Sequence, residues 1–212
     1  MLKQVVVFGN RISEDIIGNI IEDNLPVDVI KLENGRVEQE TESEIRIQVD
    51  RRLSPYVGKV DLIILCDPEI TLSSLQFLKC KYPGQEFVGY GYNLAGAIKK
   101  ERRVRVLLPH IAKRMLYYQK MKSECVGVDI SEGEYDFEEY KDQNFIERFL
   151  EGFANGLVIV YTPVLFHLER QLRARVSWRA NVIDMRDSLL RDTCKALKLR
   201  GLDGGLARDV KG

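Results

Sequence analysis

The sequence predicts an α/β protein of two similar lobes, each with a mainly parallel sheet flanked by helices, and a ligand cleft between the lobes. Two stretches carry this prediction, residues 61–69 and 156–163, because each is an apolar run of strand length that leads directly into a helix start. In both stretches a proline follows the strand, and proline is favoured at the first position of a helix. Open α/β sheets bind ligands at the carboxyl ends of their strands, so we expect Cys66 and Tyr161, which end the two runs, to face a shared cleft.

Strands and helices alternate along most of the chain. Short apolar runs predict strands at residues 4–8, 27–32, 61–66, 86–90, 104–108, 125–130, 157–161 and 181–184. Apolar residues at helical spacing predict helices at residues 13–24, 44–57, 68–81, 93–100, 110–118, 135–154, 163–175 and 188–199. This alternation predicts mainly parallel sheets that are covered on both faces.

The boundaries of the lobes follow from the same order of elements. We expect residues 1–98 to form the first lobe, completed by residues 180–200, and residues 99–179 to form the second lobe. The densest run of charges, residues 99–103, is typical of a solvated loop between the lobes, and anion binding is the alternative. Residues 201–212 are rich in glycine and charge, which predicts a mobile tail.

The composition limits the classes of partner. Lys plus Arg and Asp plus Glu each number 32, so the formal net charge is zero, which argues against a general nucleic-acid binder. No apolar stretch approaches membrane-spanning length, and the N-terminal apolar run is too short for a signal peptide. The four cysteines form no CxxC or CxH pattern, which favours reduced thiols over a zinc site or a disulfide scaffold. We therefore expect a cytoplasmic protein with neither nucleic acid nor membrane as a partner.

Several short motifs follow one another in a characteristic order. They are Val-Val-Val-Phe-Gly-Asn at residues 5–10, Leu65-Cys66-Asp67-Pro68, the strand start at residues 103–106, Cys125 with the later pair Glu132-Gly133, Val160-Tyr161-Thr162-Pro163, and Val182-Ile183-Asp184. In this order the chain resembles the aspartate/glutamate racemase superfamily over residues 4–199. The resemblance implies a two-lobe fold, a small-molecule carboxylate or other anion as ligand, and no metal or organic cofactor. It leaves a homodimer open.

The chemistry of this superfamily implies two thiols, one that removes the α-proton from one face of the substrate and one that returns a proton to the opposite face. The chain departs from the pattern at four positions. Tyr161 replaces the second thiol, Gly9 a loop aspartate, Asp67 an asparagine that binds the substrate carboxylate, and Pro163 a histidine. These departures argue against classical racemisation of glutamate and leave Cys66 as the sole thiol at a catalytic position.

The resemblance and the strand ends together select the candidate site. Cys66 and Tyr161 are the catalytic candidates, Cys66 because a helix N-terminus can lower the pKa of a thiol. The ligand-binding candidates lie at turns between strands and helices: Asn10, Arg11, Asp67, Asn93, His110 and Thr162. Each type has a structural alternative, since a buried thiol can be a packing residue, a tyrosine can line a cleft, an arginine can form a surface salt bridge, and Asp or Thr can cap a helix.

Two functions remain open from the sequence. The first is a cofactor-independent isomerase or lyase for a small carboxylate, such as a decarboxylase, in which Cys66 is the only thiol acid or base. The second is a non-catalytic anion-binding or regulatory protein that kept the cleft. A nucleotide-binding role ranks last because neither GxGxxG nor GxxxxGK(S/T) occurs in the chain.

Overall fold

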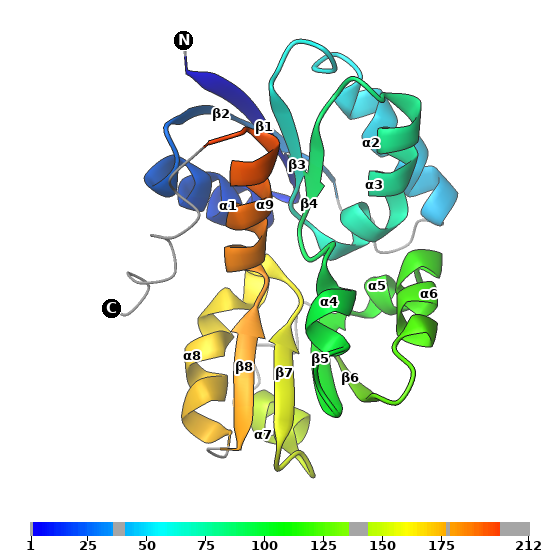
Figure 1. Cartoon of the computed structure of the whole chain (residues 1–212), viewed down its shortest axis with the longest axis vertical. Coiled ribbons are helices and arrows are strands. Elements are labelled where there is room, and N and C mark those ends of the chain that lie inside the picture. Colours follow the sequence, from blue (N-terminus) through cyan, green and yellow to red (C-terminus); the bar gives the residue numbers. More distant parts are fainter. Residues whose placement is uncertain (1, 36–40, 136–143, 177–178, 200–212) are drawn as a thin grey trace. The chain divides into compact units, whose positions relative to one another are not determined.

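The computed structural model describes residues 2–35, 41–135, 144–176 and 179–199 of the 212-residue chain. The chain divides into two compact units, one formed by residues 1–92 and the segment from Arg186 onward, the other by residues 93–185. Each unit contains a four-stranded sheet whose pairings are all parallel. The prediction of an α/β protein with two helix-flanked parallel sheets is confirmed (Figure 1).

The sheet of the first unit has the strand order β2-β1-β3-β4. Its strands are β1 (Lys3–Gly9), β2 (Val27–Glu33), β3 (Leu62–Leu65) and β4 (Phe87–Gly89). Its helices are α1 (Arg11–Asn24), α2 (Glu42–Leu53), α3 (Pro68–Lys81) and α9 (Arg186–Ala196). In Figure 1, α1 and α9 lie on one side of this sheet and α2 and α3 on the other. This cover explains why all four side chains of the central strand β3 are buried.

Local sequence explains two of the helix starts in the first unit. Asn10 caps α1, since its Oδ1 accepts hydrogen bonds from the N–H groups of Ile12 at 3.1 Å and Ser13 at 3.0 Å. Thr41 begins α2 with a capping box, in which its hydroxyl accepts from the Glu44 N–H while the Glu44 carboxylate accepts from the Thr41 N–H at 2.7 Å. Both caps pair backbone donors that a first helical turn leaves open.

The sheet of the second unit has the strand order β6-β5-β7-β8. Its strands are β5 (Arg103–Pro109), β6 (Asp129–Tyr135), β7 (Gly156–Val160) and β8 (Ala180–Asp184). Its helices are α4 (Leu94–Ile98), α5 (His110–Arg114), α6 (Leu116–Glu124), α7 (Phe145–Leu150) and α8 (Phe166–Arg175), with a 3₁₀ turn at Pro163–Leu165. After β8 the chain enters α9, which packs against β3 and β4 of the first unit.

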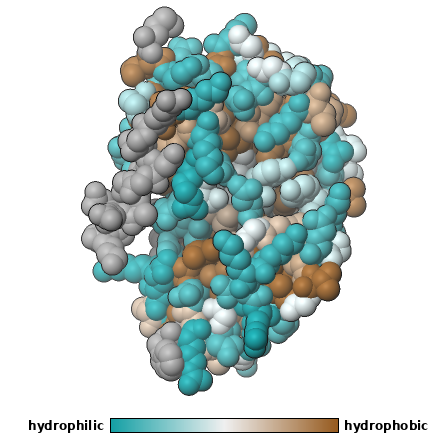
Figure 2. Space-filling model, viewed as in Figure 1, coloured by the Kyte–Doolittle hydropathy of each residue, from teal (hydrophilic) through white to brown (hydrophobic). Residues whose placement is uncertain are grey.

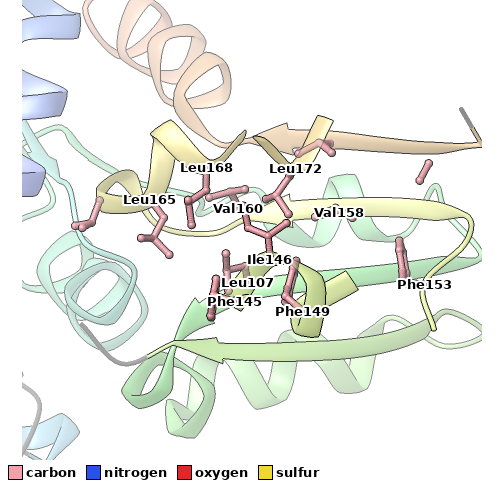
Figure 3. Packing of buried hydrophobic residues seen from close by; sticks show 13 residues of the cluster. Leu107, Phe145, Ile146, Phe149, Phe153, Val158, Val160, Leu165, Leu168 and Leu172 are labelled. Carbon is pink, nitrogen blue, oxygen red and sulfur yellow. The ribbon is translucent and has the colours of Figure 1, made fainter. Parts of the chain in front are cut away.

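One apolar cluster forms much of the core of the second unit. Figure 3 shows side chains from β5, β7, α7 and α8 meeting there, among them Phe145 and Phe149 of α7. The two rings are nearly parallel, with centroids 6.3 Å apart. On β6, a Cβ at Gly133 would lie 2.2 Å from the Phe149 ring, so glycine at this position is what lets α7 pack so closely.

Both sheets follow the same connectivity, in which the strands lie in the order second, first, third, fourth. The chain therefore runs in opposite directions from the two central strands, and the switch points fall between β1 and β3 and between β5 and β7. Open α/β sheets bind ligands at the carboxyl ends of strands at such a switch point. The topology thus identifies one candidate binding edge in each unit.

Three sequence predictions differ from the structure in the second unit. The strand predicted at residues 125–130 is wrong, because Cys125 begins a turn in which Gly127 has φ +83°, and β6 starts only at Asp129. The helix predicted at residues 135–154 is reduced to α7, while residues 136–143 lie outside the described part. The helix expected from residue 110 is broken at Met115, whose ψ of 134° is extended, so that α5 and α6 are separate.

The face of the molecule drawn in Figure 2 is mostly polar. Figure 2 shows hydrophilic side chains over most of the visible face, with apolar side chains in small groups between them. In the part of the chain that the structure describes, no helix has the length and apolar character that crossing a membrane requires.

Candidate functional site

The switch points collect most of the candidate residues. In the first unit, Asn10 and Arg11 follow β1, while Cys66 and Asp67 follow β3. In the second unit, His110 follows β5, and Tyr161 and Thr162 follow β7. Asn93 is apart from both groups, as an exposed residue at the start of α4. The expectation that Cys66 and Tyr161 face one another concerns two separate units and stays a prediction.

Asp67 links the two central strand ends of the first unit. Its Oδ2 accepts a hydrogen bond from the Asn10 N–H at 2.6 Å, and its Oδ1 accepts from the Asn10 Nδ2 at 2.7 Å. Asp67 stands at the N-cap position of α3, but its side chain makes no hydrogen bond to the first turn of that helix. The capping role considered for Asp67 is therefore wrong, and the carboxylate instead holds the β1 and β3 ends together.

The Asp67 carboxylate packs directly against Gly9 of β1. A Cβ at Gly9 would stand 2.9 Å from Asp67 Oδ2 and 2.9 Å from the Cβ of Cys66, closer than such atoms normally approach. Glycine at position 9 therefore leaves the space that the Asp67 carboxylate occupies. The resemblance places an aspartate at the position of Gly9. In this chain the carboxylate beside that position belongs to Asp67, which follows β3.

The Cys66 thiol is buried and held in its protonated form. Its relative exposure is 0%, and its backbone N–H donates to the Phe8 carbonyl at 2.9 Å. Burial raises the pKa of the Cys66 thiol well above its ordinary value, and the negative charges of Asp67 and Glu14 raise it further. The expectation of a thiol activated by a helix N-terminus is not met in this state, because desolvation and two carboxyl groups oppose it.

Asp67 titrates near neutrality. Burial raises its pKa from 3.8 to about 6, and the negative charge of Glu14 adds to this effect. The hydrogen bond from the Asn10 N–H acts in the opposite direction, because it favours the ionised carboxylate. A carboxyl group in this range can both hold and release a proton under physiological conditions.

Glu14 belongs to the same cluster and was missed by the sequence interpretation. It lies in the first turn of α1, is 8% exposed, and its Oε2 is buried without a hydrogen-bond partner among the described residues. Burial raises the pKa of Glu14, with further contributions from Asp15 and Glu33. A signal was present, since Glu14 lies three residues before Ile17 and four after Asn10, on the stripe that α1 turns toward the sheet.

Arg11 is exposed at the start of α1. The salt bridge considered for it does not form with any of the described residues. Its positive charge is close enough to Glu14 to lower the pKa of that carboxyl group. Arg11 is therefore a cation at the β1–β3 switch point that can contact an anionic ligand.

The corresponding edge of the second unit carries Tyr161, Thr162 and His110. Tyr161 is fully buried, and its N–H donates to the Leu107 carbonyl at 2.8 Å. Thr162 is 1% exposed and does not directly begin α8, because the 3₁₀ turn at Pro163–Leu165 intervenes and the helix starts after Leu165. The capping role considered for Thr162 stays a prediction, since a helical segment begins directly after it at Pro163. His110 is exposed at the start of α5.

Glu132, one of the residues that carry the resemblance, is occupied by other side chains. Its carboxylate accepts hydrogen bonds from Lys122 Nζ at 2.6 Å and the Tyr118 hydroxyl at 3.2 Å, and Lys113 Nζ lies 3.7 Å away. Cys125 packs against Met121, with the two sulfur atoms 4.0 Å apart. In this arrangement Glu132 anchors α6 to the edge strand β6.

The described residues contain no ready site for a metal ion. No group of three His, Cys, Asp or Glu side chains is placed there to hold an ion. The chemistry available at the β1–β3 edge is therefore that of one protonated thiol, two carboxyl groups with raised pKa values, and one exposed guanidinium.

The fold matches solved structures of racemases and an isomerase. A glutamate racemase of Bacillus anthracis superposes with a TM-score of 0.76 over 94% of this chain and 83% of its own, at 10% identity. Escherichia coli glutamate racemase, solved with L-glutamate and an activator, gives 0.74 over 94% and 84%, at 13% identity. A maleate isomerase of Pseudomonas putida gives 0.63 over 94% of both chains, at 16% identity. The chain thus has the fold of the aspartate/glutamate racemase superfamily, as the sequence resemblance implied.

Comparison of the sequence with protein-family models and with curated proteins finds no match. No protein-family model matches the chain. No curated protein matches it at a significant level. At 10–16% identity the three structures establish the fold, whereas the chemistry has to be argued from the residues of the site.

Proposed function

We propose that this chain, with the fold of glutamate racemases and maleate isomerase, is a cofactor-independent isomerase or lyase for a small carboxylate. In the proposal the Cys66 thiol is the proton donor. The observation that supports it best is the buried, protonated Cys66 thiol beside Asp67 at the β1–β3 switch point. Arg11, exposed at the same edge, supplies a cation for the substrate carboxylate.

A single thiol suits proton delivery to one face of a substrate. In a decarboxylation, the bond from the α-carbon to the departing carboxyl group breaks, CO₂ leaves, and the electron pair stays on the α-carbon. The Cys66 S–H proton then transfers to that carbon. The resulting thiolate recovers a proton from solvent, for which the adjacent Asp67 carboxyl, with its pKa of about 6, is a suitable relay. The product of such a reaction has one handedness, because only one face receives the proton.

The reaction class can be tested without knowing the substrate. The protein is incubated in D₂O with small dicarboxylates, 2-substituted malonates and α-amino acids, and the α-carbon signals are followed by ¹H NMR. We expect deuterium at the α-carbon of the product, and we expect Cys66→Ala to lower the rate by about 10²–10⁴-fold. Cys80→Ala is the matched control, because Cys80 is an exposed thiol outside the site. Undiminished turnover by Cys66→Ala would contradict the proposed role.

The complete burial of Cys66 favours a second candidate, a non-catalytic protein that binds a small anion. In that case a carboxylate from the same panel raises the unfolding temperature, by an amount equivalent to about 2.7 kcal/mol at one hundred times its Kd, without any deuterium incorporation. Arg11→Gln should weaken such binding, because it removes the exposed cation at the switch point. The exchange experiment therefore separates the two candidates directly.

A further inference from the structure

Glu14 occupies an unusual environment for a carboxylate. Helix α1 turns one face toward the sheet, and Glu14 lies on that face together with Ser13 and the apolar residues Ile17 and Ile21. The Glu14 N–H donates to the Asn10 carbonyl at 2.9 Å, so Glu14 lies one turn beyond the residue that binds Asp67. Glu14 therefore lies in the first turn of α1, directly after the end of β1.

The Glu14 carboxyl group is not compensated by a hydrogen bond at its buried oxygen. Within the described part of the chain Oε2 is buried and has no partner, whereas isolated buried carboxylates are costly and normally paired. The charged and titratable groups facing Glu14 come from three elements: Arg11 and Asp15 of α1, Lys31 and Glu33 of β2, and Cys66 and Asp67 after β3. A buried carboxyl group with an unpaired oxygen, in the same cluster as a buried thiol, calls for a functional explanation.

We propose that Glu14 is a positioning residue of the Cys66 site, whose negative charge opposes the ionisation of Asp67 and of the Cys66 thiol. Like charges in a poorly solvated site disfavour one another. Once one group has lost its proton, the neighbouring groups therefore hold their own protons more tightly. Glu14 acts through Asp67 and Cys66 and has no direct contact with the reacting carbon in this inference. It rests on the proposed function only in treating Cys66 as the proton donor.

The test measures the titration of Asp67 and needs no substrate. The protein is labelled with ¹³C at the Asp and Glu carboxyl carbons, and the chemical shifts are followed from pH 3.5 to 8.5. We expect Glu14→Gln to lower the titration midpoint of Asp67 from its value of about 6, by about a threefold loss of proton affinity. Glu22→Gln, an exposed change on the same helix, is the control and should leave the midpoint in place.

A measurement on the unmodified protein makes the test independent of the variant. If the two groups are coupled, the Asp67 and Glu14 signals each show a second inflection at the midpoint of the other. An Asp67 midpoint that is equal in the two variants, or single independent titrations of Asp67 and Glu14 in the wild type, would overturn the inference. Because no turnover is measured, an inactive protein would contradict the proposed function without affecting this result.

Discussion

Replacing Asp67 with asparagine gives the sharpest test of the buried carboxyl cluster. Asparagine has nearly the same shape as aspartic acid but carries no charge. The two Asn10 groups that bind Asp67 are both donors, so the asparagine oxygen can accept from one of them and the other loses its acceptor. At pH 4, where the folded protein keeps Asp67 protonated, we expect Asp67→Asn to be less stable than the wild type by about 1–3 kcal/mol, the cost of the lost hydrogen bond. The difference should then shift in favour of the variant as the pH rises.

The magnitude follows from the pKa of Asp67. Burial raises it from 3.8 to about 6, so between these values the folded state holds a proton that the unfolded state has released. The folded state then binds more protons, and its stability falls as the pH rises through this window. The difference of about 2.2 pKa units corresponds to about 3 kcal/mol, which the wild type loses and Asp67→Asn keeps.

Urea unfolding at half-unit steps from pH 4 to pH 7.5 provides the measurement. The quantity of interest is the difference in free energy of unfolding between variant and wild type, because titrating groups that do not interact with Asp67 cancel in it. This difference should move by about 3 kcal/mol in favour of Asp67→Asn over the series. Asp23→Asn, an exposed change on α1, should give a difference that does not follow this course. A constant difference for Asp67→Asn, or a shift in the opposite direction, would refute the reasoning.

Two further substitutions probe the local structure around the site. Gly9→Ala should destabilise the protein by about 1–3 kcal/mol, because its Cβ would stand 2.9 Å from both Asp67 Oδ2 and Cys66 Cβ. Gly84→Ala meets no atom within 4 Å and should be neutral or stabilising by up to about 1 kcal/mol in the same urea assay, and equal effects of the two would contradict the packing argument. Thr41→Ala should cost about 1 kcal/mol and raise the pKa of Glu44 measured by NMR, because the capping box holds that pKa below its ordinary value; an unchanged Glu44 pKa would argue against the box.

Most of the fold could be predicted because the buried parallel strands are apolar and closely followed by helices. The run that became β3 is an example, since Leu62, Ile63 and Ile64 are all fully buried and Pro68 begins the next helix. The prediction failed where a strand is polar. β6 contains Ser131, Glu132 and Gly133, which are typical of a loop, yet it lies at the edge of the sheet, where one side of the strand needs no strand partner.

The electrostatic state of the site could not be predicted from the sequence. The adjacency of Cys66 to a helix start indicates a lowered thiol pKa, but the sign depends on how completely the thiol is desolvated and on Glu14, which is fifty-two positions away in the chain. The partner of Asp67 was equally hidden, because the side chain at an N-cap position normally bonds its own helix. Here the Asp67 carboxylate accepts from Asn10 instead, because β1 and β3 approach closely at Gly9.

The chemistry of the β1–β3 edge therefore follows from one packing arrangement. Gly9 leaves room for the Asp67 carboxylate, Asn10 fixes it there, and the resulting negative charge stands beside a thiol that has no access to water. A thiolate is disfavoured in this environment. The resting Cys66 thiol therefore keeps its proton and can donate it to a carbanion that develops on the substrate. A chain with one thiol at this position is thus suited to the protonation half of the two-thiol reaction, and the removal of a substrate proton by Cys66 would first require the carboxyl groups around it to change their own protonation.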